Sequence, residues 1–257
     1  MTAVAKLVHL AVRSGIATIT LDSPANRNAL SPQLRAELLD ALQRSSQDRS
    51  VRVVILDHTG PAFCAGMDLR EARQESEQGV GEFRRILEQI YTSPKPVVAK
   101  VAGAARAGGI GMVAAADVAV ATNDATFAFT EVRIGLVPAV ISVTVLPRLL
   151  PHAAHELFLT GETFDATRAV TIGLLNSAVP ADQLAAEVAR YTDMLSTGAP
   201  EALTLTKQML HRNHASAMAE HFTAMLELSA QRFASEEGQE GIRAFAEKRP
   251  PSWIPRP

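Results

Sequence analysis

The chain has 257 residues, of which 47% are hydrophobic and 20% are charged, a balance that is typical of a globular protein with a substantial core. A net charge of −2 and scattered basic residues argue against a nucleic-acid partner. The single cysteine, Cys64, excludes an intrachain disulfide and a thiolate metal cluster within one chain.

The N-terminal residues lack a long apolar stretch followed by a small-residue cleavage site. The longest apolar run, residues 108–120, contains glycines and Asp117, and it is too short to span a membrane. We therefore expect a cytoplasmic protein without a membrane partner.

The first elements are predicted to be two paired strands. Residues 6–12 and 16–21 both show the alternation of apolar and polar side chains that is typical of strands. Ser31 then provides a helix N-cap, and Pro32 suits the first helical position. The apolar spacing after Pro32 predicts a helix that ends near residue 45.

Strand and helix patterns alternate from residue 50 to about residue 130. Buried strands are predicted over residues 51–57 and 97–101, and shorter strands over residues 117–122 and 126–130. This alternation favours parallel strands joined by crossover helices.

Strand patterns end near residue 180. Helices are predicted over residues 181–196, 199–215, 216–234 and 238–248, and the prolines after residue 249 cannot continue a helix. We therefore divide the chain into an α/β core of residues 1–195 and a C-terminal helical region of residues 196–257.

Two turns of small residues each follow a predicted strand. Residues 62–69 (AFCAGMDL) form the first turn, and residues 107–112 (AGGIGM) form the second and open a helix. Small residues leave backbone N–H groups unscreened, so two neighbouring turns could direct two such groups at one oxygen. The same glycines could instead serve only close packing of a helix on a sheet, and their spacing does not fit a dinucleotide fingerprint.

Several longer segments resemble the enoyl-CoA hydratase/isomerase (crotonase) superfamily. Residues 95–117 (KPVVAKVAGAARAGGIGMVAAAD) are similar to the signature segment of that family. Residues 63–69 resemble its first oxyanion-hole loop, and residues 129–135 (FTEVRIG) resemble the segment of its second catalytic glutamate. Further similar segments follow in the same order at residues 159–166, 173–174, 179–180 and 240–249. The resemblance thus covers nearly the whole chain.

The resemblance implies an α/β fold, namely a crotonase-like spiral of ββα units with a C-terminal helical trimerisation region. It also implies a homotrimer or a dimer of trimers that acts on an acyl-CoA thioester. No separate cofactor and no metal are expected, because coenzyme A is part of the substrate.

The resemblance also implies roles for individual residues. The thioester carbonyl would accept hydrogen bonds from the backbone N–H groups of Ala65 and Gly108, and each such donor typically contributes about 3–4 kcal/mol to an oxyanion-like transition state. Glu131 would carry the proton. Gly109 belongs to the same substrate-binding turn. Arg27 and Lys248 match positions where the family places cations near the CoA nucleotide, although both could be ordinary surface charges.

The chain departs from the family pattern at one position. Family hydratases usually carry two glutamates, and Gly111 stands where the first would lie. A single carboxylate fits proton relocation more simply, whereas residues 134–142 (IGLVPAVIS) resemble methylglutaconyl-CoA hydratases that have a small residue at the first position. We expect an enoyl-CoA hydratase that adds water to 2-enoyl-CoA. A Δ3-Δ2 isomerase that uses Glu131 alone and a non-catalytic acyl-CoA binder remain alternatives.

The remaining polar candidates have plainer interpretations. Glu131 could be a surface glutamate near a strand end, and Cys64 is interpreted as a small buried residue rather than a nucleophile. Other ionisable side chains are interpreted as solvated or structural groups: Glu71, Glu75, Glu77, His58, His152 and His155.

Overall fold

Two β-sheets form the centre of the protein, which a computed structural model describes over residues 5–68 and 72–255, without the side chains of residues 72–77 and 212–217. The larger sheet has the order β1-β2-β3-β5-β7-β10. Its strands are β1 (Val8–Arg13), β2 (Ile16–Leu21), β3 (Val53–His58), β5 (Val97–Val101), β7 (Val118–Thr122) and β10 (Ser177–Val179). The smaller sheet consists of β4 (Ala62–Cys64), β6 (Ala104–Arg106), β8 (Thr126–Ala128) and β9 (Phe164–Asp165), in that order.

Strand directions match the predicted α/β class. In the larger sheet β1 and β2 form an antiparallel hairpin, and all the other neighbouring pairs are parallel. In the smaller sheet β4, β6 and β8 run parallel, and only β9 is antiparallel. Parallel strands need crossover connections, which the helices provide.

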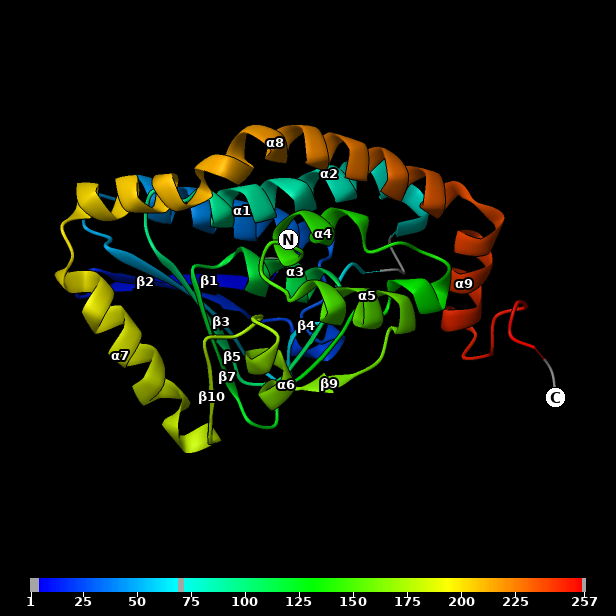
Figure 1. The fold of residues 1–257 in the computed structure, drawn as a ribbon, viewed down its shortest axis with the longest axis horizontal. Coiled ribbons are helices and arrows are strands. Elements are labelled where there is room, and N and C mark those ends of the chain that lie inside the picture. The colour runs from blue at the N-terminus through cyan, green and yellow to red at the C-terminus, as the bar shows by residue number, and fades with distance from the viewer. Residues whose placement is uncertain (1–4, 69–71, 256–257) are drawn as a thin grey trace.

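From β3 to β8 the two strands of each consecutive pair enter different sheets, and a helix then follows the pair. The pairs β3–β4, β5–β6 and β7–β8 are followed by α2 (Ala72–Tyr91), α3 (Gly108–Ala115) and, after the 3-10 helix η2 (Glu131–Ile134), α4 (Ala139–Val145). This repeat confirms the predicted spiral of ββα units (Figure 1).

The first helix begins where the sequence predicted. In α1 (Pro32–Gln47) the Ser31 hydroxyl accepts the Leu34 N–H at 3.3 Å, and Pro32 occupies the first turn. Leu34, Leu38 and Leu42 are buried against the core. The helix ends two residues after the predicted position, at Gln47.

The smaller helices lie around the sheets. They are η1 (Pro24–Asn26), α5 (Pro151–Thr160), α6 (Ala166–Thr171) and η3 (Ala181–Gln183). α7 (Leu184–Thr197) packs Leu184 and Val188 against valines of the larger sheet, on the face away from α2 and α3 (Figure 1).

The C-terminal region contains a longer helix than predicted. α8 (Pro200–Ala234) is one helix of 35 residues, so the predicted break between residues 215 and 216 is wrong. No glycine or proline occurs near residue 215 to end a helix. α8 packs along α2 and α4, and α9 (Glu236–Ala246) turns back beside η2 (Figure 1).

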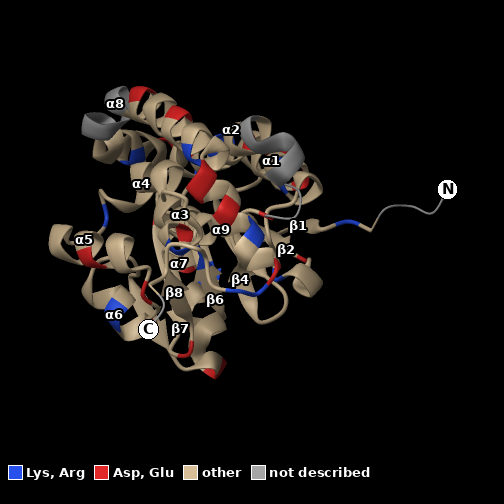
Figure 2. Ribbon diagram, turned by 90° about the vertical axis from the view of Figure 1, so that its right-hand side faces the viewer, with Lys and Arg blue, Asp and Glu red and all other residues tan. Residues whose placement is uncertain are grey.

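The proposed division at residue 195 and the trimerisation role of the C-terminal region stay predictions. In the part of the chain that the structure describes, none of the helices combines the length and the apolar character that a bilayer span requires. Acidic and basic residues are mixed over the helices on the face seen in Figure 2.

Candidate active site

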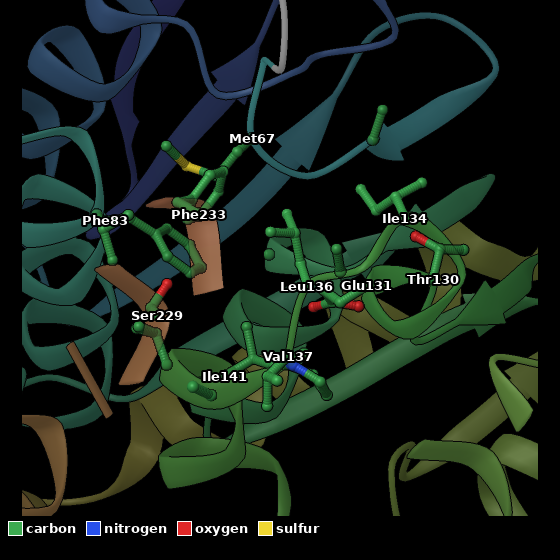
Figure 3. Close-up of a pocket in the computed structure, with 17 residues that line it drawn as sticks. Met67, Phe83, Thr130, Glu131, Ile134, Leu136, Val137, Ile141, Ser229 and Phe233 are labelled. Atoms are coloured by element: carbon green, nitrogen blue, oxygen red, sulfur yellow. The ribbon is translucent and has the colours of Figure 1, made fainter. Parts of the chain in front are cut away.

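A cavity of about 100 Å³ opens between α2, η2, α4 and the C-terminal half of α8. Its lining is mainly apolar and includes Met67, Val80, Phe83, Ile134, Leu136, Val137, Val140, Ile141 and Phe233 (Figure 3). Ala65, Gly108 and Glu131 also line it. The fold therefore brings together three residues that the sequence analysis placed in one site, although they are up to 66 positions apart.

The first turn, after β4, is fixed by the loop that precedes α1. Asn28 is fully buried, and its side-chain amide donates to the carbonyl groups of Thr59 at 2.9 Å and Ala62 at 2.8 Å. The Leu30 N–H donates to the Gly66 carbonyl at 2.8 Å. Because these bonds are buried, the turn is held rigidly against the core.

The N–H group of Ala65 has a partner within the protein. It donates to the carbonyl oxygen of Arg27 at 3.1 Å, so in this structure it is not directed at a substrate. Met67 lines the same cavity, and its parallel bridge with Leu30 leaves the Met67 N–H pointing away from Leu30. Within the described part of the chain the Met67 N–H has no hydrogen-bond acceptor. Of these two N–H groups in the turn, Met67 rather than Ala65 therefore has the one that could bind a ligand in the cavity.

The second turn lies directly beside the first. Gly108 is the first residue of α3, where backbone N–H groups have no partner within the helix and the helix dipole is positive. A Cβ atom on Gly66 would lie 3.0 Å from the Ala107 Cβ and 3.6 Å from the Gly108 nitrogen, and Gly66 also has a φ of +91°. Glycine at position 66 thus allows the two turns to approach and present their N–H groups together.

Gly109 has the packing role that the sequence analysis kept open. A Cβ atom there would lie 2.6 Å from the Cys64 carbonyl oxygen, and Gly109 does not line the cavity. Cys64 is buried, as interpreted, and burial raises the pKa of its thiol to about 12. A thiol with that pKa is a poor nucleophile near neutral pH.

Glu131 carries a buried carboxyl group. The residue as a whole is partly exposed, but its Oε2 is buried and has no hydrogen-bond partner among the described residues. Burial raises the pKa of Glu131 to about 7. This excludes the alternative of an ordinary surface glutamate. A carboxyl group with such a pKa can both accept and donate a proton near neutral pH.

The space beside Gly111, where the family resemblance implies a first glutamate, is filled by another side chain. A Cβ atom on Gly111 would lie 2.7 Å from Cγ2 of Ile141 and 3.5 Å from Cδ2 of Leu87. Ile141 is a buried residue of α4. Among the described lining residues, Glu131 is therefore the only ionisable one.

The helices contribute lining residues that the sequence analysis missed. Ser229 and Phe233 of α8 are buried in the cavity wall. In Figure 3 the Glu131 carboxylate lies on the opposite side of the cavity from Phe83 and Ser229. Apolar spacing along α8 could have indicated a buried face, but not that this face meets η2.

A buried ion pair supports the α2 side of the cavity. Arg35 of α1 is 3% exposed, and its Nε lies 2.9 Å from Glu82 Oε2, while its Nη1 donates to the Leu30 carbonyl at 2.8 Å. Val80 and Phe83 flank Glu82 and line the cavity. The pair therefore links α2 to the loop that bonds with the first turn.

The predicted nucleotide contacts lie outside the cavity lining. Arg27 is exposed in the loop beside the first turn, and Lys248 is exposed just after α9. Their contacts with CoA stay predictions.

The other ionisable candidates lie away from the cavity as well. His58 is buried, and its Nε2 accepts the Ala102 N–H at 2.9 Å, which confirms a structural role. His152 and His155 are exposed, as interpreted. Glu71 and the side chains of Glu75 and Glu77 lie outside the described residues.

Known proteins resemble this chain over almost its whole length. The sequence profile described as "Enoyl-CoA hydratase/isomerase" matches residues 11–256. A crystal structure of an enoyl-CoA hydratase from Mycobacterium avium is 40% identical, covers 98% of this chain and 100% of its own, and gives a TM-score of 0.90. Carnitinyl-CoA dehydratase of Proteus mirabilis is 32% identical over 96% of this chain and 97% of its own length. Human enoyl-CoA hydratase domain-containing protein 3, mitochondrial, is 31% identical over 95% of this chain and 82% of its own length.

Proposed function

Since the chain belongs to the enoyl-CoA hydratase/isomerase family, we propose that it adds water to 2-enoyl-CoA thioesters through an enolate. The observation that carries this proposal is the buried Glu131 carboxyl group, with a pKa near 7, in the same cavity as the Gly108 turn. A thioester bound between them has a place for developing negative charge and a group that moves protons.

The thioester oxygen would accept hydrogen bonds from the N–H groups of Met67 and Gly108. Both residues line the cavity, and the N-terminus of α3 stands behind Gly108. Such donors act on charge that develops during the reaction, and loss of one typically costs about 3–4 kcal/mol of transition-state stabilisation. Because the turns are fixed before substrate binds, little reorganisation is needed.

Glu131 would transfer the proton in two steps. In its ionised form it takes a proton from water while the water oxygen bonds to C3, and the π electrons of the C2–C3 double bond move to the thioester as an enolate. Neutral Glu131 then gives this proton to C2 and the carbonyl group reforms. The product is a 3-hydroxyacyl-CoA, and Glu131 returns to its ionised form.

Ile141 supports isomerisation as a second candidate. Its side chain fills the space beside Gly111 where a second carboxylate would help to hold water. Glu131 alone could take a proton from C2 of a 3-enoyl-CoA and return it to C4, with the same N–H groups stabilising the dienolate.

The absorbance of the conjugated enoyl thioester tests both candidates. We expect a panel of 2-enoyl-CoA esters to lose this absorbance with the wild-type protein, and Glu131→Gln to abolish the loss. A gain from 3-enoyl-CoA esters, without loss from 2-enoyl esters, would instead establish the isomerase. Tight acyl-CoA binding without either change would overturn both and leave a non-catalytic binder.

Assembly and location remain part of the proposal. We expect a homotrimer or a dimer of trimers, as the family resemblance implies, and a cytoplasmic location, as the N-terminal sequence and the short apolar runs suggest. Light scattering coupled to size-exclusion chromatography would report a mass of three or six chains, and a monomer would contradict the prediction.

A further inference from the structure

Two glycines bring the backbone of α9 against the segment that carries Glu131. A Cβ atom on Gly241 of α9 would lie 2.8 Å from the Cα of Ile134 in η2, and still closer to the Ile134 carbonyl group. A Cβ atom on Gly135 would lie 2.7 Å from the carbonyl carbon of Glu237 in α9, and 3.1 Å from the Gly238 nitrogen. Real Cβ atoms essentially never come within 3.0 Å of another heavy atom, so neither side of this contact has room for a methyl group.

Polar contacts hold the same interface. The Arg232 guanidinium, at the end of α8, donates to the Gly135 carbonyl at 3.2 Å and pairs with Glu237 at 2.5 Å. The charged side chains that make these contacts, Arg232 and Glu237, do not line the cavity. They fix α9 beside η2 without adding charge next to Glu131.

α9 is stabilised at both ends and buried along one face. At its start the Ser235 hydroxyl caps the helix by accepting the Gly238 N–H at 3.1 Å. Near its end, Arg249 makes two bonds to the Glu240 carboxylate, at 2.6 and 2.9 Å. These bonds are local, but Ile242 of α9 is buried and belongs to the main hydrophobic core. Because of this packing, the helix cannot move aside easily when a side chain is added at its contact with η2.

A displacement at Ile134 would reach Glu131 because both belong to one 3-10 turn. The Glu131 carbonyl accepts the Leu136 N–H at 3.0 Å, and Gly135 donates to the Val132 carbonyl at 3.4 Å. Glu131 and Ile134 both line the cavity. The backbone of η2 therefore transmits a push from α9 to the carboxyl group.

We propose that α9 is a positioning element for Glu131, with Gly241 as the residue whose lack of a side chain sets the depth of η2 in the cavity wall. The inference rests on the proposed role of Glu131 but makes a claim of its own. It concerns where the carboxyl group is held, independently of which enoyl-CoA reaction follows.

The test is the substitution Gly241→Ala in the full-length protein. The added methyl group should push η2 and expose the Glu131 carboxyl group to water. We expect the pKa of Glu131 to fall from about 7 toward the ordinary glutamate range. This is measured by ¹³C NMR titration of labelled glutamate carboxyl groups, with the Glu131 signal assigned by its absence in Glu131→Gln. We also expect kcat to fall by about tenfold to a hundredfold, as small misplacements of catalytic groups can do.

Acyl-CoA binding separates a local displacement of η2 from a general loss of structure, because a general loss of structure would weaken binding as well. We expect the Kd for a saturated, unreactive acyl-CoA to stay within about twofold, a change well under 1 kcal/mol, because no residue of α9 is among the described lining residues of the cavity. Gly81→Ala is the matched control. It is the same change within a helix, and no atom lies within 4 Å of the added Cβ position, so its kcat and Glu131 titration should match the wild type.

If Gly241→Ala does not fold, Arg232→Met replaces it, since that variant removes only the bonds to Gly135 and Glu237 and should shift the titration in the same direction. An unchanged Glu131 titration in a folded Gly241→Ala protein overturns the proposal. So does a loss of kcat that comes with an equal loss of acyl-CoA binding. An altered titration in a protein that turns over no enoyl-CoA would instead reject the proposed function alone.

Discussion

The two sides of the cavity are built in different ways. The sheet-side wall, made of Ala65, Met67, Ala107 and Gly108, offers a substrate mainly backbone groups that buried hydrogen bonds hold in place. The helical wall, made of Glu131, Ile141, Ser229 and Phe233, offers side chains from three separate segments. We propose that this difference separates two tasks: the sheet-side wall would stabilise charge on the thioester oxygen, and the helical wall would decide which proton moves and which acyl group fits.

The strongest way to test this division is to remove the only ionisable group of the helical wall that the structure describes. We expect Glu131→Gln to lower kcat/KM by about 10²–10⁴-fold, the range for loss of a general acid–base group. Acyl-CoA binding should persist because the sheet-side wall is unchanged. Steady-state kinetics and calorimetric titration measure the two effects. Glu162→Gln, an exposed change, is the control. Full activity in Glu131→Gln would contradict the division.

The sheet-side wall could be predicted from sequence more fully than the helical wall. Small residues directly after strands identify a turn with exposed backbone groups, and the order of strands places the two turns side by side. The sequence pointed to Ala65, but the N–H group of that residue bonds to the carbonyl group of Arg27. Arg27 has a left-handed backbone conformation, with a φ of +57°. Local patterns do not encode such a contact.

The helical wall depends on packing between distant segments. Glu131 could be identified only through its family-like surroundings, and its burial follows from helices more than 90 residues further along the chain. Gly111 indicated a missing carboxylate, but nothing in the sequence shows that Ile141 fills its space. Ser229 and Phe233, which line the cavity, belong to α8, a single helix that was predicted as two.

The pH dependence of the helical wall provides the next test. Hydration needs ionised Glu131, so kcat/KM should fall about tenfold per pH unit below about 7, where the carboxyl group becomes protonated. A pH–rate profile with stable buffers measures this limb. If kcat/KM falls only near the ordinary pKa of a glutamate, the carboxyl group is solvated during turnover.

The same shift has a consequence for stability. Burial raises the pKa of Glu131 from 4.5 to about 7, so between these values the folded state holds the proton more tightly than the unfolded state. Stability therefore falls as pH rises through this window, by up to about 3 kcal/mol. Glu131→Gln lacks this loss. Relative to wild type it should gain stability between about pH 5 and pH 8, as measured by urea unfolding. A constant difference between the two proteins would contradict the prediction.

A smaller effect is expected where the helical wall meets α3. Gly111→Ala places a methyl group 2.7 Å from Ile141 Cγ2, and overpacking of this kind costs about 1–3 kcal/mol. In the background of Ile141→Ala the crowding atom is absent, so the same substitution should cost much less. A double-mutant cycle of unfolding free energies measures the coupling. Additive effects would mean that Ile141 does not occupy this space in solution.

The smallest effect is expected on the sheet-side wall, at the residue that precedes the Gly108 donor. Ala107 has φ +46° and ψ −116°, a conformation that disfavours any residue with a Cβ atom. Ala107→Gly relieves this strain but adds freedom to the unfolded chain, so we expect a net gain in stability of about 1 kcal/mol. Activity should change less than twofold, because the bond from the Ala107 N–H to the Ala128 carbonyl, 3.2 Å long, holds the turn in either case.

Ala105→Gly in β6 is the control for this prediction. Ala105 is buried and has no positive φ, so this substitution should destabilise the protein by about 1 kcal/mol. If Ala107→Gly loses activity while it gains stability, the strain itself orients the Gly108 N–H, and the sheet-side wall depends on that one side chain as well as on its backbone.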